Sequence, residues 1–166
     1  MARRAWGPWL TIVLTIGVLG CSPGEGPGAE DRNEPAREIT RQSFSEFGDF
    51  VVHFNAQPTD MLPPTVARAY GIQRSENRAM LNVSVLRKAE GSIGQPVTAD
   101  VTVAARNLTG QLKNVSIRKI EEAGAIYYIG ELGVANRETL IFEISVTPEG
   151  ESETHVVRFR QQFYTS

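Results

Sequence analysis

The sequence predicts a mainly β fold: an antiparallel, immunoglobulin-like β-sandwich of seven or eight strands with one short helix. Three observations favour this class. Hydrophobic residues recur at every second position, turn residues separate these segments, and only one segment carries helical signals. Strands with one apolar and one polar face are typical of antiparallel sheets, and two such sheets packed together bury the apolar faces. A small β-barrel is the alternative.

The predicted strands follow one another along residues 41–164. Alternation is clearest in residues 50–55, 81–85 and 97–106. Other segments rich in Ile, Val, Phe and Tyr are 41–47, 112–121, 125–132, 139–147 and 154–164. Turn residues separate the strands at 48–49, 91–96, 107–110 and 148–150. The count is seven or eight because Gly48-Asp49 suits either a tight hairpin or a bulge in one bent strand.

The alternation also predicts the members of a single hydrophobic core. Val83, Val101, Val103, Phe142 and Phe159 fall on the apolar faces of their strands. Thr102 falls on a polar face, so we expect its replacement to cost little stability.

The one predicted helix lies between the second and third strands. Pro63 and Pro64 stand at its opening and Gly71 just past its end, which is the usual asymmetry of helix termini. Two turns are too few for an isolated helix to persist in water. We therefore expect Leu62, Val66 and Tyr70 to pack on the sandwich and to cap one open end.

Residues 1–20 have the layout of a bacterial lipoprotein signal peptide. Arg3 and Arg4 precede a short apolar run, and Gly20 stands directly before Cys21. The pattern predicts cleavage before Cys21 and acylation of its thiol by chains such as palmitate. The apolar run from Trp9 to Gly20 has 12 residues, whereas a helix needs roughly 20 to cross a bilayer. An ordinary secretory peptide, giving a soluble periplasmic protein, is the alternative.

The N-terminal pattern also predicts location and domain boundaries. Ser22 follows the cysteine, and in Gram-negative bacteria a residue other than Asp at this position directs a lipoprotein to the outer membrane, here facing the periplasm. Residues 21–39 comprise the lipidated cysteine and a tether rich in Gly, Pro and acids, for which we expect disorder. Residues 40–166 are enough for a single domain.

Charge and cysteine content narrow the classes of partner. Loss of Arg3 and Arg4 with the signal peptide leaves 15 basic against 19 acidic side chains, a net charge of −4. Nucleic-acid binding needs a basic surface, so the balance argues against it. Cys21 is the only cysteine, and once acylated it leaves no thiol for a disulfide, a nucleophile or a metal.

No catalytic residue set is visible in the sequence. The chain has no G-x-S-x-G elbow, no phosphate-binding loop and no dinucleotide fingerprint. The alternation places His53 on a polar face and His155 on a core face, so we expect no metal site and no cofactor. Replacement of both histidines should leave the melting temperature unchanged with or without zinc.

Two groups of polar residues are candidate ligand contacts. Arg74, Asn77 and Arg78 belong to the loop after the helix, and two guanidinium groups there could clamp a carboxylate or a phosphate. The alternative is an ordinary turn whose arginines pair with neighbouring acids. His53 and Asn55 share the exposed face of one strand and form the second group.

Several segments of the folded part resemble one known bacterial family. They are FGDFVVHFNA (47–56), VARAYGIQRSENRAMLNVSV (66–85), NLTGQL (107–112), AIYYIGE (125–131), VTPEG (146–150) and the closing VRFRQQFYTS. In this order and spacing they resemble domain of unknown function 4426. The resemblance implies a small exported protein of proteobacteria, without an assigned activity and without catalytic residues to carry over.

The sequence therefore leaves the molecular activity open. A non-enzymatic binding or accessory module that contacts an envelope protein or glycan is the function we expect. A structural or stress-related envelope component is the alternative, and an enzyme would need a site that the sequence does not display. The oligomeric state stays open.

Overall fold

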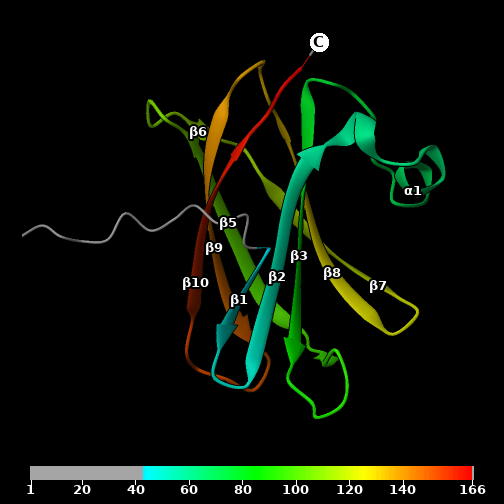
Figure 1. The fold of residues 1–166 in the computed structure, drawn as a ribbon, viewed down its shortest axis with the longest axis vertical. Helices are drawn as coiled ribbons and strands as arrows, with labels where there is room; N and C mark the ends of the chain where they lie inside the picture. The colour runs from blue at the N-terminus through cyan, green and yellow to red at the C-terminus, as the bar shows by residue number, and fades with distance from the viewer. Residues whose placement is uncertain (1–42, 166) are drawn as a thin grey trace, which may run out of the picture. The chain divides into compact units, whose positions relative to one another are not determined.

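The computed structural model describes residues 43–165 as two antiparallel sheets packed face to face (Figure 1). Sheet A has the strand order β1-β2-β3-β8-β7, with β4 also paired to β3, and sheet B has the order β10-β9-β5-β6. The predicted class, a mainly β sandwich with one short helix, is confirmed. The sheets of this part do not close on each other, so the barrel alternative is wrong. The predicted signal peptide, Cys21 and the whole predicted tether lie outside the described residues.

The bounds of the elements are as follows. Sheet A consists of β1 (Phe44–Phe47), β2 (Phe50–Pro58), β3 (Arg78–Arg87), β4 (Gln95–Pro96), β7 (Ser116–Glu122) and β8 (Ala125–Gly133). Sheet B consists of β5 (Ala99–Asn107), β6 (Leu112–Lys113), β9 (Thr139–Pro148) and β10 (His155–Gln162). A 3-10 turn (Thr59–Met61) and helix α1 (Pro64–Ala69) connect β2 to β3.

The inner faces of the two sheets form the main core, as the alternation predicts. Fully buried members include Val52, Leu81, Val83, Val85, Leu140, Phe142, Ile144 and Val146. Val101, Val103 and Phe159 pack against this core but are partly exposed. Thr102 is exposed on the opposite face of β5. The predicted faces of these strands are therefore confirmed.

Two details of the strand prediction are settled by the pairing. Phe47 pairs with Phe50 across Gly48-Asp49, and Gly48 has a φ of 52°, so these residues form a tight hairpin. The segment 112–121, predicted as one strand, is divided into β6 and β7. Leu112-Lys113 pair with β5 in sheet B, whereas Ser116–Glu122 pair with β8 in sheet A. The chain crosses between the sheets at Asn114-Val115, and an alternating pattern carries no signal for such a crossing.

Helix α1 has the predicted ends but a different position. Pro64 occupies its first turn, and Gly71 follows it with a φ of 61°. Leu62, Ala67 and Ile72 of this segment pack on Met80 of β3 and Ile129 of β8 in a second, smaller core. Both strand residues point outward from sheet A, so the helix covers part of that outer face (Figure 1). The expectation that it caps an open end is wrong.

The smaller core also corrects the predicted contacts of α1. Leu62 is buried as expected and Tyr70 packs against this core. Val66 is half-buried and is not a member of it, whereas Ala67 and Ile72 are. In the described part of the chain, no helix has the length and hydrophobicity needed to cross a membrane.

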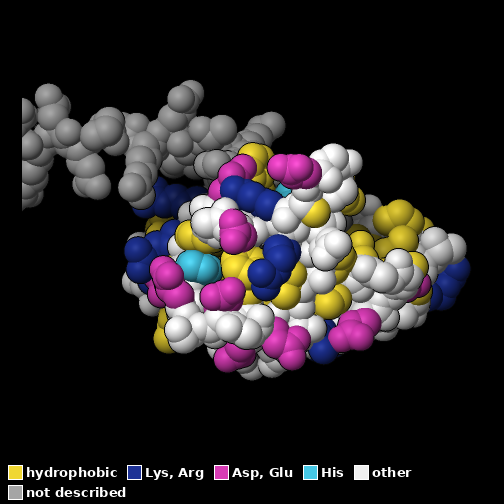
Figure 2. Space-filling view, turned by 90° about the horizontal axis from the view of Figure 1, so that it is seen from below, with side chains coloured by type: hydrophobic (Ala, Val, Ile, Leu, Met, Phe, Trp, Pro, Cys, Tyr) yellow, Lys and Arg dark blue, Asp and Glu magenta, His cyan; other side chains and the backbone are white. Residues whose placement is uncertain are grey.

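Charged side chains of both signs are interspersed on the end of the domain shown in Figure 2. Lys and Arg alternate there with Asp and Glu, and hydrophobic side chains lie between them. This end presents no basic patch of the kind that binds nucleic acid.

Candidate functional site

The loop that carries Arg74 and Asn77 is anchored by Thr59, a buried residue at the start of the 3-10 turn that follows β2. Thr59 is fully buried, and its Oγ1 lies 2.9 Å from Gln73 O and 3.0 Å from Ser75 O. The same oxygen accepts a hydrogen bond from Ser75 N at 2.9 Å. Asn77 O accepts a further bond, of 3.0 Å, from Val134 N beyond β8. The loop is therefore held by backbone contacts on both sides.

Arg74 and Arg78 have different partners in this structure. Arg74 Nη2 donates to the carbonyl oxygen of Asp60, whereas Arg78 Nη2 lies 3.2 Å from Glu131 Oε2. Each guanidinium group contacts a separate partner, and the predicted clamp on a ligand stays a prediction. The alternative, an ordinary turn with paired arginines, applies in part. Arg78 N donates a hydrogen bond to Ser75 O across a turn. The Arg78 side chain pairs with an acid, Glu131, which is far away in sequence. A role of Arg74 and Asn77 in ligand binding stays a prediction.

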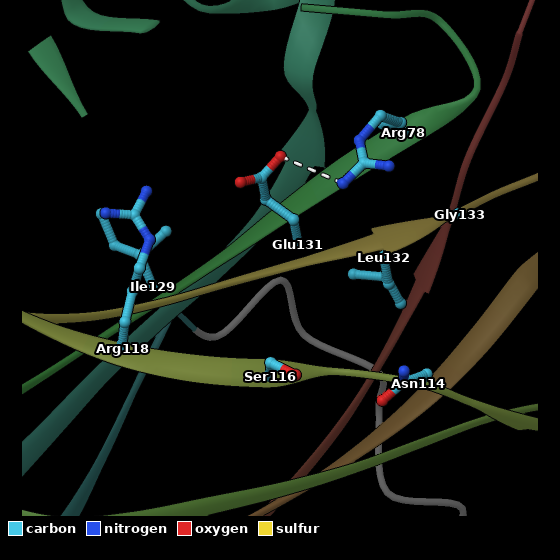
Figure 3. A pocket seen from close by; sticks show the side chains of 8 residues that line it. All are labelled: Arg78, Asn114, Ser116, Arg118, Ile129, Glu131, Leu132 and Gly133. Carbon is cyan, nitrogen blue, oxygen red and sulfur yellow. Dashed lines mark hydrogen bonds and ion pairs between the residues drawn. The ribbon is translucent and has the colours of Figure 1, made fainter. Parts of the chain in front are cut away.

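Arg78 instead lines a hollow on the outer face of sheet A. The hollow has a volume of about 430 Å³ and is formed by strands β3, β7 and β8 with the crossing before β7. Its lining residues are Arg78, Asn114, Ser116, Arg118, Ile129, Glu131, Leu132 and Gly133. Figure 3 shows the side chains of Arg78, Glu131 and Arg118 projecting to the same side of the sheet. The volume falls in the range of small-molecule sites.

Strand pairing brings the polar lining residues together. Ser116 lies opposite Glu131, and Arg118 lies opposite Ile129, across the β7–β8 pair. Arg78 lies at the start of β3, opposite Gly133 at the end of β8. Polar residues of three segments that are far apart in sequence therefore line one hollow. We call the hollow formed by Arg78, Asn114, Ser116, Arg118 and Glu131 the polar hollow.

The helix segment is fastened to β7 beside the polar hollow. Arg118 Nη2 donates to Tyr70 O, and the Tyr70 hydroxyl donates to Glu122 Oε2 at 2.5 Å. The hydrogen bond to the Glu122 carboxylate favours the protonated phenol and raises the pKa of Tyr70. Tyr70 therefore stays neutral well above neutral pH, and both contacts hold α1 near the edge strand.

His53 and Asn55 lie on the outer face of sheet A as well, over its other half. His53 pairs with Ser84 and Asn55 with Asn82 across β2 and β3. The ring of Phe44 in β1 lies 5.8 Å from the His53 ring. We call this set of amide, hydroxyl and ring groups the outer strip. The sequence predicts five ligand contacts, and three of them lie on the outer face of sheet A: His53, Asn55 and Arg78.

The two histidines lie apart, as their strand positions predict. His155 is mostly buried, and its ring stacks on Phe47 at a centroid distance of 4.7 Å. His53 belongs to the outer face of the other sheet. No group of three potential metal-binding side chains occurs among residues 43–165. The expectation that zinc leaves the melting temperature unchanged stays a prediction.

The comparison with family models identifies the family. The model described as "Domain of unknown function (DUF4426)" matches residues 44–166. The chain belongs to this family, and the resemblance seen in the sequence is confirmed. The family carries no assigned activity, and no curated protein matches the chain.

Two solved structures are similar to this one. A DUF4426 family protein from Pseudomonas aeruginosa PAO1 has 34% sequence identity and a TM-score of 0.63, over 74% of this chain and 94% of that chain. FetP from uropathogenic Escherichia coli strain F11, recombinantly expressed in the periplasm, has 8% identity and a TM-score of 0.53. That match covers 74% of this chain and 93% of FetP, and it shows a likeness of fold alone.

Proposed function

We propose that this protein is a lipid-anchored module of the bacterial envelope that binds another envelope molecule, a protein or a glycan, without catalysing a reaction. The observation that carries the proposal is the polar hollow on the outer face of sheet A. It offers guanidinium, amide and hydroxyl groups in a cavity of about 430 Å³. Ligand sites are usually concave, and their polar groups fix the orientation of the ligand.

The side chains of the polar hollow suit binding better than catalysis. Ser116 is its one hydroxyl, and a serine nucleophile needs a base within hydrogen-bond reach. The nearby carboxylate of Glu131 bonds to Arg78 instead. Since the hollow contains no histidine or cysteine, its groups are hydrogen-bond partners rather than an activated nucleophile.

The envelope location rests on the signal peptide pattern that ends at Cys21. The periplasmic expression of FetP, a protein of similar fold, agrees with such a location. We propose anchoring at the outer membrane, facing the periplasm, with a soluble periplasmic protein as the alternative.

Site-specific photo-crosslinking in living cells tests whether sheet A binds a partner. A photoreactive residue placed at Ser116 or at Asn114 should give a crosslinked product, because both positions line the polar hollow. Thr102 provides the matched control, since it is exposed on the outer face of sheet B. Equal products at all three positions, or none at the first two, would contradict the proposal and favour a purely structural component.

A further inference from the structure

We infer that the polar hollow binds a carboxylate that carries a single negative charge, such as the end of a peptide or an acidic sugar substituent, with Arg118 as its principal contact. The inference rests on the proposed function and names its ligand class. It follows from three features of the polar hollow: the state of each guanidinium group, the balance of charge, and the neutral donors at its rim.

Arg78 and Arg118 have different freedom to bind a ligand. Arg78 is held by the ion pair with Glu131, and its Nε is buried without a hydrogen-bond partner in the described structure. Arg118 is exposed, and its bond to Tyr70 O uses one of the five N–H groups of a guanidinium. The remaining N–H groups suit the planar, two-oxygen geometry of a carboxylate.

The balance of charge favours a monoanion. Arg78 and Arg118 contribute two positive charges and Glu131 one negative charge, so the polar hollow has a net charge of +1. One carboxylate would neutralise it. A phosphate dianion would leave an excess negative charge beside Glu131, and like charges repel more strongly in a partly desolvated site than in bulk water.

Neutral groups complete the site. Asn114 and Ser116 line the same hollow as Arg118, from the crossing between the sheets and the start of β7. Figure 3 shows Ser116 on the strand that carries Arg118 and Asn114 on the segment just before it. An amide and a hydroxyl donate hydrogen bonds without adding charge, so they can bind the second oxygen of the carboxylate or its neighbouring groups.

The outer strip is a second polar surface on the same face of sheet A. Its members are Phe44, His53, Asn55, Asn82 and Ser84. The polar hollow, in contrast, is a cavity whose lining residues define the size and the charge of an occupant. We therefore assign ligand recognition to the polar hollow.

Nuclear magnetic resonance of arginine side chains tests the inference on the full chain in detergent micelles. The probes are N-acetylalanine, which has a free carboxylate, alaninamide, which has an ammonium group instead, and inorganic phosphate. We expect N-acetylalanine to shift the Nε–Hε signal of Arg118 in a saturable way and to bind more tightly than the other two. A stronger effect of phosphate, an equal effect of alaninamide, or no saturable shift would overturn the inference.

Variants separate the contacts of the polar hollow. Arg118→Gln should weaken N-acetylalanine binding by about tenfold or more, because it removes a charge-assisted hydrogen bond. Arg118→Lys keeps the charge but loses the planar fork, so its loss should be smaller. Arg160→Gln is the matched control: Arg160 is exposed on sheet B, and the binding should be unchanged. An equal loss in the control would overturn the assignment of Arg118.

A third variant tests the balance of charge. Glu131→Gln raises the net charge of the polar hollow by one, so phosphate binding should become stronger than in the unaltered protein. An unchanged or weaker phosphate affinity would overturn the charge argument. If crosslinking at Ser116 succeeds but N-acetylalanine does not bind, the ligand class is wrong and the proposed function stands.

Discussion

Phe142 shows how single side chains join the two sheets. Its ring stacks on Phe159 at 4.8 Å and meets Phe163 edge-on at 6.5 Å. Phe159 in turn lies 4.8 Å from Phe54 of sheet A. Aromatic pairs in these geometries stabilise a core beyond the effect of buried area alone. The contacts therefore run from β10 and β9 across the interior to β2.

The contacts of Phe142 lead to a prediction about stability. Phe142→Ala should lower the free energy of unfolding by about 3–5 kcal/mol, because the residue is fully buried and leaves a cavity. Phe159→Ala should cost less, since part of that side chain is exposed. Denaturant melts measure both, with Thr102→Ala as a control that should cost well under about 1 kcal/mol. Similar losses in all three variants would show that the core is assigned to the wrong face.

Sequence patterns predict whether a residue lies on the inner or outer face of its sheet far better than they predict which residues it contacts. The alternation placed His53 outside and Phe142 inside, and both positions are confirmed. Arg118 was missed because it lies in a charged stretch of an edge strand, and only the β7–β8 pairing brings it beside Glu131. The sequence groups Arg78 with Arg74, its neighbour along the chain, whereas its hydrogen-bond partner Glu131 is more than 50 residues away. Such pairings depend on strand order, which local periodicity does not encode.

At the scale of elements, one ion pair fixes the end of sheet B where the chain leaves for sheet A. Lys113 of β6 bonds to Glu138, which directly precedes β9, with an Nζ–Oε1 distance of 2.7 Å. Glu138 also accepts a hydrogen bond of 2.9 Å from Ala135 N. Burial alone would raise the pKa of Glu138, but these bonds outweigh it and hold the pKa below the usual value of a glutamate.

The lowered pKa of Glu138 predicts a specific pH dependence of stability. A carboxylate with a depressed pKa in the folded state stabilises the fold above its unfolded pKa, and the contribution is lost as the pH falls through the folded pKa. Glu138→Gln should therefore lower stability at pH 7 by roughly 1–2 kcal/mol. The difference from the unaltered protein should shrink below about pH 4.3, the ordinary glutamate value, and then vanish.

Denaturant melts at several pH values would measure this difference. Glu143→Gln is the control: hydrogen bonding to Arg158 also lowers the pKa of Glu143, but that pair is exposed to solvent and screened. Its effect should be much smaller at every pH. A difference for Glu138→Gln that stays constant down to pH 3 would show that the ion pair does not stabilise the fold.

A strand whose surroundings stay the same along its length is predictable from its sequence pattern. A segment that changes its pairing partner is not. The strands near Val83 and Val101 were predicted because one face stays buried along their length. The segment 112–121 changes sheets in its middle, so its two parts face different surroundings while their composition stays the same. The helix is predicted from its prolines and Gly71. Its position on sheet A depends on Met80 in the next strand and on Ile129, which lies far along the chain.

For the whole molecule, the proposed anchor and the proposed binding face have separate roles. The anchor would restrict the domain to a membrane surface, while the outer face of sheet A supplies the contacts. A tether raises the effective concentration of a binding site toward partners within its reach. A weak site such as a single carboxylate contact therefore gains most from lipid attachment. This coupling makes the anchor essential to the proposed function even though it adds no contact.

The anchor is tested by Cys21→Ser. Serine has no thiol to acylate, so we expect loss of metabolic palmitate labelling and loss of cleavage before residue 21. Two or three acyl chains hold a protein stably in a bilayer, whereas one chain binds only marginally. Loss of the acyl chains in the variant should therefore also change the membrane fraction in which the protein is found. Ser22→Asp is the matched control: it should keep the label and move the protein from the outer to the inner membrane in a density gradient. Label retained by the Cys21→Ser variant would mean that the chain is not lipidated at this residue. Absence of label in the unaltered protein would favour the soluble periplasmic alternative.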